Sequence, residues 1–539
     1  MRSASISNHT TASSPRPHVL YNILVTLPDA GTRRIQRRYS EFVALHLALG
    51  DTFALPPKRL LVTTFIPSAW VDDALISERK AGLSAYLINL VHSPKYGDHD
   101  LVSQFLGPAG KPRPFDLEDA LPSTLSRGTA AMLDKARVLE NDDSLSSTKP
   151  IAAGYYEDWA TSPAAGSINF SKFDVIFFAF ATPSSSYGIS LDSGSASMLK
   201  TLVTGAHKSG TKVVLSVGGW GGCEYYSALM KTSANRTTFI NALSSAVSKY
   251  DLDGIDIDWE YPNDPGAGQP YSSADSANFL LFLKSFRSKL GSSKIISAAV
   301  TQLPWLGSNG KPLTNVSAYT DEMTYVNIMN YDVNSSSAHP GANAPLSNAC
   351  GTSSQPTATA AAAFKQWTAA GCPASKLLLG LPLYGYVSKS TATKLSGSFK
   401  EPGASDEEAD VGKTVGQAHP RQRARHGAED GEAATGDLNS WFGQQIPFNS
   451  LLSSGALVKN SDGTYGAANG YTRAWDSCSS TPFLHDTSRQ TVVTYDDTVS
   501  LADKAAYAKS VGMGGCFTWA LDQDNGTALQ SVIRSSLGI

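Results

Sequence analysis

The chain has 539 residues, of which 41% are hydrophobic and 17% are charged, and its formal net charge is -3. Such a chain can bury a sizeable core and is long enough for more than one domain. Its charge gives no indication of a nucleic-acid partner, and we predict none. No stretch approaches the roughly 18 to 20 apolar residues that a membrane-spanning helix needs, so we also predict no transmembrane segment.

The first residues, MRSASISNHTTASS, lack the apolar core of a secretion signal, so the sequence as given predicts an intracellular protein. We predict that residues 1–16 are disordered and that an α+β domain follows at 17–108. This domain contains the strand-like stretch HVLYNILVTL, the motif RRIQRRYSEF, a proline-marked stretch and the amphipathic helix ERKAGLSAYLINLV, in that order. It resembles the phox-homology (PX) domains. The resemblance implies binding to membranes that contain a phosphoinositide, for which we expect phosphatidylinositol 3-phosphate.

The resemblance also implies lipid-binding roles for four residues. Arg38 is expected to hold the 3-phosphate and Tyr39 to stack on the inositol ring. Lys58 is expected to meet a second phosphate, and Arg79 to bind hydroxyls of the ring. These residue types suit the roles, because arginine presents a bidentate fork to phosphate and lysine presents a compact point charge.

A proline-containing loop between these positions carries Phe65, Ile66 and Trp70. If these apolar side chains are exposed, they could enter the interfacial region of a bilayer. The alternative interpretation is that Phe65 and Trp70 are core residues and that Arg37 and Arg38 form a solvated basic surface.

After a linker predicted at 109–148, strands and helices alternate through residues 149–539. The eight strand-like stretches are IAAGYY, VIFFAFA, KVVLSVGG, GIDIDWEY, KIISAAVTQ, MTYVNIMNY, KLLLGLPLYG and GGCFTWAL. One of the helical segments between them carries five apolar residues at the spacing of a single buried face: Phe279, Phe282, Leu283, Phe286 and Leu290. Eight such repeats predict an α/β fold, a (β/α)8 or TIM barrel, with its active site at the C-terminal ends of the strands.

A long insertion at 386–490 separates strands seven and eight, and we expect it to form a small α+β unit. Inside it, residues 400–437 contain no Leu, Ile, Met or aromatic residue and are dense in charge. Such a segment cannot bury a core, so we predict that it is disordered. Our hypothesis is that it is non-native coding sequence, such as a retained intron.

The stretch DLDGIDIDWEYP, at Asp251–Pro262, concentrates the acidic residues of the predicted barrel. At the period of two residues that a strand has, Asp256, Asp258 and Glu260 share one face. Neighbouring ionised carboxylates repel, so their pKa values must be pushed apart, which is what acid catalysis needs. The alternatives are an exposed acidic edge strand and a cation site.

Three motifs in this half of the chain resemble glycoside hydrolase family 18, the chitinases and their relatives. The pattern D-G-x-D-x-D-x-E is complete in Asp253, Gly254, Asp256, Asp258 and Glu260. The pattern M-x-Y-D occurs at Met329–Asp332, and S-x-G-G at Ser216, Gly218 and Gly219.

The resemblance implies substrate-assisted hydrolysis with retention, in which the acetamido oxygen of the sugar is the nucleophile. Glu260 is then the general acid and later the base, and it needs a raised pKa for the first role. Asp258 holds the acetamido N–H and shares a proton with Asp256. Tyr331 hydrogen-bonds the acetamido oxygen, and no metal or organic cofactor is implied.

Further residues are expected to bind the sugar. By resemblance, Trp519 forms the floor under the reacting ring and Asp332 helps to orient it, in the same motif as Met329; for Trp519 alone, a core position is the alternative. Weaker candidates for the cleft are Tyr156, Trp220, Trp305, Tyr384, Arg473 and Trp475.

The leading hypothesis is therefore a chitinase acting on chitin or chito-oligosaccharides. Three alternatives stay open: a chitin-binding lectin, an endo-β-N-acetylglucosaminidase acting on N-glycans, and a phosphoinositide-binding endosomal adaptor with an inactive sugar-binding barrel. The two halves also predict different locations, since a PX domain works at cytoplasmic or endosomal membranes and a chitinase outside the cell or at the wall. We hypothesise that two neighbouring genes have been joined in one coding sequence; the alternative is a genuine bifunctional protein.

The five cysteines are too few and too scattered to indicate a disulfide framework or a zinc site: Cys223, Cys350, Cys372, Cys478 and Cys516. A bridge between Cys350 and Cys372 is one hypothesis, which no other feature of the sequence supports.

Overall fold

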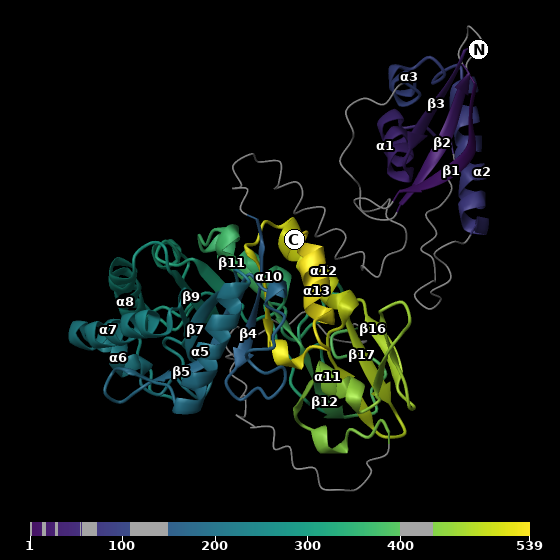
Figure 1. Cartoon of the computed structure of the whole chain (residues 1–539). Helices are drawn as coiled ribbons and strands as arrows, with labels where there is room; N and C mark the ends of the chain where they lie inside the picture. Colours follow the sequence, from purple (N-terminus) through teal and green to yellow (C-terminus); the bar gives the residue numbers. More distant parts are fainter. Residues whose placement is uncertain are drawn as a thin grey trace. The chain divides into compact units, whose positions relative to one another are not determined.

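The computed structural model describes residues 3–12, 18–26, 31–53, 55, 73–107, 149–398 and 435–539 (Figure 1). Contacts divide the chain into two compact units, Met1–Lys135 and Ala136–Ile539. The linker expected at 109–148 and nearly all of the charged segment at 400–437 fall outside the described residues. Among those that are described, no helix is both long enough and apolar enough to cross a bilayer.

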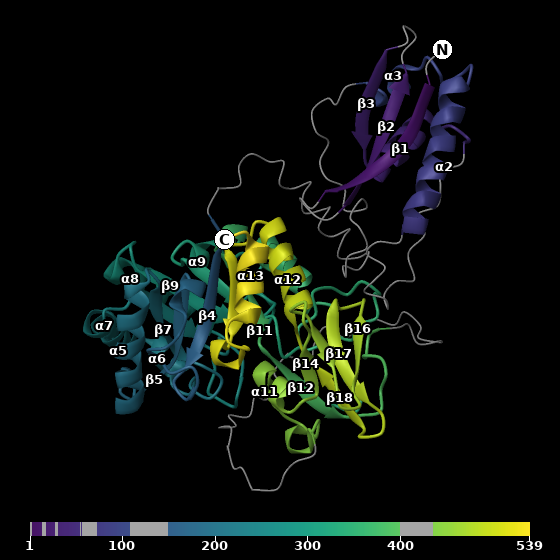
Figure 2. The same cartoon turned by 45° about the vertical axis from the view of Figure 1, so that its right-hand side comes forward.

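The first unit is a three-stranded antiparallel sheet with helices, as expected for a PX domain (Figure 2). Its strands are β1 (Ser3–Ala12), β2 (His18–Thr26) and β3 (Thr32–Arg37), paired in that order. Its helices are α1 (Tyr39–Leu49), α2 (Asp73–His92) and α3 (Asp100–Phe105). The core includes Tyr21, Phe42 and Tyr86, each at most 1% exposed.

The prediction of disorder at residues 1–16 is wrong for Ser3–Ala12, which form β1 and pair with β2 with one register shift between Ile6 and Asn8. This strand lies at the edge of the sheet, so few of its side chains need to reach the core. Ala4 is buried and Ile6 packs against the core. An edge strand of this kind has no apolar run, which is why the sequence did not indicate it.

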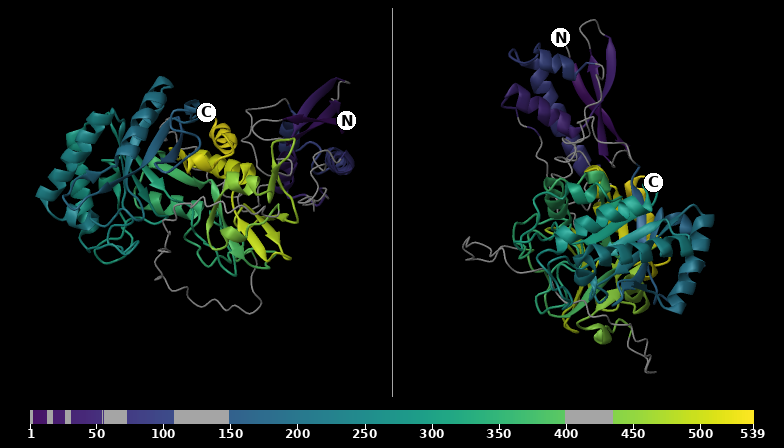
Figure 3. Two further views of the ribbon diagram at one scale, coloured as in Figure 1. Left: turned by 60° about the horizontal axis from the view of Figure 1, so that its bottom comes forward. Right: turned by 90° about the vertical axis from the view of Figure 1, so that its left-hand side faces the viewer.

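The second unit contains the predicted barrel (Figure 3). Its eight parallel strands are β4 (Ile151–Glu157), β5 (Val175–Pro183), β7 (Lys212–Gly218), β8 (Gly254–Asp258), β9 (Ile295–Val300), β10 (Tyr325–Ile328), β11 (Leu377–Pro382) and β19 (Gly515–Trp519). They pair in the order β4-β5-β7-β8-β9-β10-β11-β19, and β19 pairs again with β4, which closes the barrel. A short strand, β6 (Ile189–Ser190), pairs with the end of β5. The fold and all eight strand positions are confirmed.

Helices surround these strands. They are α5 (Ser193–Lys208), α6 (Tyr226–Lys231), α7 (Ser233–Tyr250), α8 (Asp275–Leu290), α9 (Ser317–Thr320), α10 (Ala360–Ala369), α12 (Thr498–Ser510) and α13 (Ala528–Leu537). In α8 the apolar residues at helical spacing are buried, except that Leu290 is half-buried. The chain enters the acidic strand through Asp251, which ends α7 with φ 55°, the left-handed conformation typical of a helix C-terminus.

The insertion forms a five-stranded antiparallel sheet, named here the insertion sheet. Its order is β13-β12-β18-β17-β16, with β12 (Tyr384–Lys389), β13 (Gln445–Pro447), β16 (Thr472–Asp476), β17 (Thr481–Asp486) and β18 (Thr491–Thr494). A hairpin of β14 (Leu457–Lys459) and β15 (Tyr465–Ala467) and the short helix α11 (Phe448–Ser453) accompany it. The sheet begins at Tyr384 and ends at Thr494, slightly outside the 386–490 predicted. Its outer parts follow directly from β11 and lead directly into α12, so composition does not mark the boundary.

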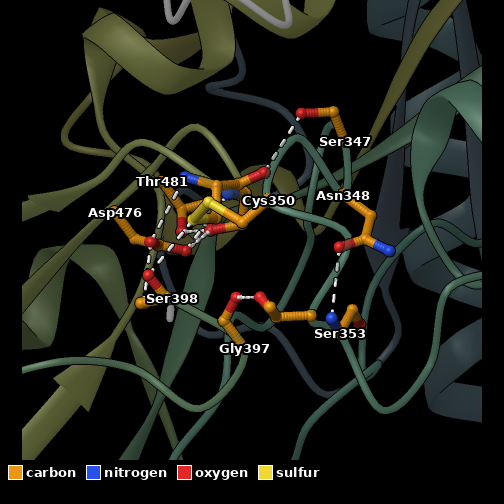
Figure 4. The surroundings of a disulfide bond; sticks show 11 residues. Ser347, Asn348, Cys350, Ser353, Gly397, Ser398, Asp476 and Thr481 are labelled. Atoms are coloured by element: carbon orange, nitrogen blue, oxygen red, sulfur yellow. Dashed lines mark hydrogen bonds between the residues drawn. A yellow bond between two sulfur atoms is a disulfide. The ribbon is translucent and has the colours of Figure 1, made fainter. Parts of the chain in front are cut away.

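A disulfide joins Cys350 to Cys478, with the two Cα atoms 5.2 Å apart (Figure 4). It connects the loop after β10 to the turn between β16 and β17, across a sequence separation of 128. The pairing of Cys350 with Cys372 is therefore wrong, and Cys372 is a buried thiol elsewhere in the barrel. Sequence spacing could not decide the pairing, because the contact depends on how the insertion sheet packs on the loop. Backbone bonds reinforce this contact, including Ala349 N–H to the Cys478 carbonyl at 2.9 Å.

Candidate active site

The acids on and beyond β8 lie inside the barrel. We call Asp256, Asp258 and Glu260 the acid row; their exposures are 0%, 3% and 5%. Such burial excludes an exposed acidic edge strand. The strand itself ends at Asp258, so Glu260 lies two residues beyond it rather than at its last position. Gly254 permits the row to start here, because a Cβ atom at this position would lie 2.2 Å from the Ile295 carbonyl oxygen.

Asp256 is fully hydrogen-bonded by side chains of other strands. Its Oδ2 accepts from Tyr155 Oη at 2.9 Å and from Ser216 Oγ at 2.7 Å. Its Oδ1 accepts from Ser297 Oγ at 2.6 Å and from Asn327 Nδ2 at 3.3 Å. Burial raises the pKa of Asp256, and the three hydroxyl donors oppose that rise because they stabilise the ionised form.

Asp258 has the opposite environment. Its Oδ1 is buried and has no hydrogen-bond partner among the described residues. Burial, followed by the nearby charges of Glu260 and Asp256, holds the pKa of Asp258 well above its usual range. A proton in this part of the site is therefore favoured on Asp258, beside an Asp256 that is surrounded by donors.

Glu260 and Tyr331 stand next to this pair. Tyr261 Oη donates to Glu260 Oε2 at 3.1 Å. Burial raises the pKa of Tyr331 well above its usual value, and Asp258, Asp332 and Glu260 all add to the rise. The phenol is therefore a hydrogen-bond donor at neutral pH, close to all these carboxylates.

Asp332 connects the barrel to the insertion sheet. Its backbone is left-handed, with φ 56°, and its N–H donates to Asn343 Oδ1 at 2.9 Å. Its Oδ1 accepts from Tyr384 Oη at 2.7 Å, Tyr386 Oη at 2.6 Å and Gln445 Nε2 at 3.3 Å. All three donors belong to β12 and β13, so the position of this carboxylate depends on the insertion sheet.

Aromatic rings lead from the barrel interior to the surface. Trp519, half-buried at the end of β19, stacks on Phe180 with ring centroids 5.7 Å apart and an interplanar angle of 25°. Phe180 also contacts Trp159, with ring centroids 6.2 Å apart, and Trp159 is 48% exposed. Tyr155 contacts Trp519 at 5.3 Å. The flat faces of sugar rings pack on surfaces of this kind.

Comparison with known proteins now identifies the domain. The family model of glycosyl hydrolases family 18 matches residues 151–524, and the PX domain model matches residues 25–109. The chain belongs to glycosyl hydrolase family 18. It is 33% identical to a chitinase-like effector of Moniliophthora perniciosa over 73% of this chain and 88% of that protein.

Other relatives agree with this membership. Chitinase A1 of Niallia circulans is 30% identical over 60% of this chain and 42% of its own length. A crystal structure of a chitinase from Rhizomucor miehei superposes with a TM-score of 0.58 at 32% identity, covering 72% of this chain and 99% of that one.

The S-x-G-G motif of the family 18 domain brings the end of β7 against the acidic strand. A Cβ atom on Gly218, whose φ is 118°, would lie 2.0 Å from the Asp258 carbonyl oxygen. One on Gly219 would lie 2.8 Å from the Phe180 ring. Only glycine therefore allows this approach.

Several expected sugar-binding residues do not reach the acid row of the family 18 domain. Tyr156 is 0% exposed and its hydroxyl donates to the Pro163 carbonyl at 2.9 Å. Trp305 is a core residue that stacks on Tyr319 at 5.1 Å. Tyr384 is 2% exposed and is engaged with Asp332.

Arg473 forms an ion pair with Asp497, at 2.6 Å, which joins the insertion sheet to the start of α12. Its guanidinium lies 5.8 Å from the Trp475 ring centroid. Met329 packs against the barrel core, and Trp220 is half-buried directly after β7.

Other contributors to the site were missed. They are Tyr155, Trp159, Ser297, Asn327, Tyr386 and Gln445. Tyr155 could have been found from the alternation of β4, where it and Tyr156 point to opposite faces. Trp159 follows the same strand at its C-terminal end, where the barrel fold places ligand-binding residues.

In the PX domain, Arg38 is the residue before α1 and is 9% exposed. Its backbone N–H donates to Glu41 Oε2 at 2.8 Å, and its Nε lies 3.7 Å from the same oxygen. Arg37 is 6% exposed and its guanidinium donates to the Phe105 and Gly107 carbonyls. The alternative of a solvated basic surface formed by Arg37 and Arg38 is therefore wrong.

Tyr39, the first residue of α1, is buried at 7% exposure. Lys58, the loop residues Phe65, Ile66 and Trp70, and the side chain of Arg79 lie outside what the structure describes.

Proposed function

We propose that the family 18 domain hydrolyses β-1,4-linked N-acetylglucosamine polymers, chitin and chito-oligosaccharides. The observation that carries the proposal is the contrast inside the acid row. Asp256 accepts four hydrogen bonds, whereas the neighbouring Asp258 keeps a buried oxygen that has no partner among the described residues. This oxygen is available for a substrate N–H, next to Glu260.

In the first step Glu260 donates its proton to the glycosidic oxygen, and the bond to the leaving sugar breaks. The acetamido oxygen of the retained sugar attacks the anomeric carbon and forms an oxazolinium ring. Asp258 accepts a hydrogen bond from the acetamido N–H as positive charge develops there. For Asp258 to carry negative charge at this stage, the proton that it holds at rest moves to Asp256.

In the second step Glu260, now ionised, removes a proton from a water molecule. The water attacks the anomeric carbon from the face that the leaving group vacated, which opens the oxazolinium ring and retains the configuration. Tyr331 donates a hydrogen bond to the acetamido oxygen throughout, and its raised pKa keeps it protonated for this task. Trp519 supports the apolar face of the reacting ring.

The test is hydrolysis of a fluorogenic chitobioside or chitotrioside by the full-length chain and by Glu260→Gln. The variant should lose activity by about a thousandfold or more, since it removes both acid and base functions. If both proteins are inactive but deletion of residues 400–437 restores activity to the chain with Glu260, the catalytic assignment holds and the charged segment is inhibitory. If the deleted chain is also inactive, hydrolysis is refuted.

A sugar-binding protein without hydrolysis is the second candidate, because the similar Moniliophthora proteins are named chitinase-like effectors rather than chitinases. The same assay separates the two: binding of chito-oligosaccharides without cleavage would favour it. An endo-β-N-acetylglucosaminidase would instead release sugars from N-glycans and leave chitotriosides intact.

We also propose that the PX domain binds phosphatidylinositol 3-phosphate through Arg38. The contacts with Glu41 support this role, because they orient the arginine at the start of α1. Vesicles that contain this lipid should capture the chain, and Arg38→Gln should abolish capture. Arg34→Gln, which removes an exposed arginine of β3, is the matched control. Equal capture of all three proteins would refute the assignment.

A further inference from the structure

The general acid lies beyond the regular sheet, so the barrel ladder does not hold it. The pairing of β8 with β7 ends at Asp258, and its pairing with β9 ends at Ile257. Glu260 follows two residues later. The backbone that sets the position of its carboxyl group therefore depends on contacts other than strand pairing.

Side chains supply these contacts at both the N–H and the carbonyl group of Glu260. The Glu260 N–H donates to the sulfur of Cys223 at 3.2 Å, and the Glu260 carbonyl accepts from Gln269 Nε2. Cys223 is 1% exposed and lies in the loop after β7. Its Sγ is also 3.3 Å from the Asp258 and Gly219 carbonyl oxygens, to either of which the S–H can donate.

The loop is shaped so that this sulfur reaches the acidic segment. Gly222 N–H donates to the Gly219 carbonyl at 2.7 Å, which makes a tight turn. A Cβ atom on Gly222 would lie 2.1 Å from the Gly218 carbonyl oxygen, so a larger residue would open the turn. The turn places the Cys223 sulfur within hydrogen-bonding distance of the Asp258 carbonyl and the Glu260 N–H.

We propose that Cys223 is a positioning residue of the hydrolase. Its thiol connects the backbone on the two sides of Trp259 and thereby fixes how far the Glu260 carboxyl group stands from Asp258. Because Cys223 acts through the backbone and does not touch the substrate, its loss should slow the chemical step without weakening substrate binding. This inference rests on the proposed function of the domain.

Sulfur suits the position for a geometric reason. A thiol donates and accepts weakly, and it does so at longer distances than a hydroxyl, whose bonds to oxygen are about 2.7 to 2.8 Å long. Serine retains both functions but cannot meet partners at 3.2 and 3.3 Å without a shift of the backbone. Alanine removes both functions and leaves a small void.

The experiment compares the full chain with Cys223→Ala, Cys223→Ser and the control Cys372→Ala. Cys372 is also a buried thiol, but within the described residues its sulfur hydrogen-bonds only to the carbonyl of Pro373, at 3.7 Å. For each protein we would measure kcat and KM on a chitotrioside, the melting temperature, and chito-oligosaccharide binding by tryptophan fluorescence.

Cys223→Ala should lower kcat by about tenfold to a hundredfold, the size expected for a misplaced catalytic group, with KM changed by no more than about twofold. Cys223→Ser should recover part of this loss. Cys372→Ala should leave kcat unchanged even if its melting temperature falls as much.

Two results would overturn the inference. One is an active wild type together with a Cys223→Ala variant whose kcat lies within about twofold of it. The other is a loss of kcat in Cys372→Ala that equals the loss in Cys223→Ala, which would mark a general effect of packing. If Cys223→Ala fails to fold, Cys223→Ser decides, since serine preserves the volume closely. Full activity in Cys223→Ser, or no activity above background, would then overturn the inference. An inactive wild type would refute the proposed function itself, and this inference with it.

Discussion

Asp256 and Asp332 are two carboxylates that both accept hydrogen bonds from hydroxyl and amide groups, but the donors belong to different parts of the domain. Asp256 accepts three hydroxyl bonds and one amide bond from barrel strands. Asp332 accepts two hydroxyl bonds and one amide bond, all from the insertion sheet. The first set is part of the rigid parallel barrel, whereas the second exists only when the insertion sheet is docked on it.

This difference separates two roles that we propose for the site: proton sharing in the acid row, which we call its chemistry, and orientation of the sugar, which we call its shape. The donors around Asp256 determine which carboxyl group in the acid row holds a proton. Those around Asp332 all come from the insertion sheet, which interrupts the barrel between β11 and β19, and we propose that this carboxylate helps to orient the sugar. Changes near Asp256 should therefore alter kcat and its pH dependence, and changes near Asp332 should alter KM.

Among the substitutions that test this comparison, that of Asp258 should have the largest effect, because its Oδ1 is buried without a hydrogen-bond partner among the described residues. Asp258→Asn should lower kcat by about a hundredfold to a thousandfold, since an amide cannot accept the shared proton or balance the charge of the oxazolinium ring. Steady-state kinetics on a chitotrioside would measure this loss. Asp253→Asn, which changes an acid at the other end of the strand, is the control for stability, and a larger loss in that variant would contradict the assignment.

The disulfide tests how strongly the insertion sheet is attached. Replacing both Cys350 and Cys478 by serine should lower the free energy of unfolding by about 2 to 4 kcal/mol, because the bridge closes a long loop in the unfolded chain. Chemical denaturation with and without reductant would measure it. The double variant should not respond to reductant, and a wild type that behaves the same way in both conditions would show that the bridge is not formed.

Tyr155→Phe removes one of the hydroxyl donors to Asp256. The hydroxyl stabilises ionised Asp256 and so opposes the rise of its pKa that burial causes. Its removal should raise that pKa further, because the ionised form loses one of its hydrogen-bond donors. Because activity needs the Asp256 and Asp258 pair to lose one of its protons, the acid limb of the kcat profile should move to higher pH.

Tyr156→Phe is the matched control for this experiment, since the neighbouring hydroxyl bonds to Pro163 instead. A shift of the acid limb in the control but not in Tyr155→Phe would contradict the orientation of β4 described above.

The same pair of tyrosines shows where prediction from sequence succeeds and fails. The acid row was predicted because all its members lie in one short motif with a fixed period. The donors to Asp256 come from four other strands and were not predicted; on β4, Tyr156 was predicted as a cleft candidate, whereas the neighbouring Tyr155 is the residue that contacts Asp256. Relative positions of distant strands are set by barrel packing, which no local pattern reports.

The PX domain and the barrel strands were predicted for a similar reason, since each strand or motif is continuous in the sequence. The strand at Ser3–Ala12, the disulfide and the contacts of Asp332 were not predicted, because each depends on a partner far along the chain. Glu260 was predicted to end its strand, yet the strand pairing of β8 stops at Asp258. Beyond that residue the backbone is hydrogen-bonded by side chains, such as Cys223 at the Glu260 N–H. The alternation of apolar and acidic residues continues past the point where pairing ends.

The smallest effect is expected at the insertion sheet. Tyr386→Phe removes one donor to Asp332 but leaves Tyr384 and Gln445 in place, so KM for a chitotrioside should rise by about threefold while kcat stays nearly constant. Tyr384→Phe should act in the same direction. If either variant lowers kcat and moves the acid limb as Tyr155→Phe does, then Asp332 belongs to the proton-sharing group, and the division between the chemistry and the shape of the site is wrong.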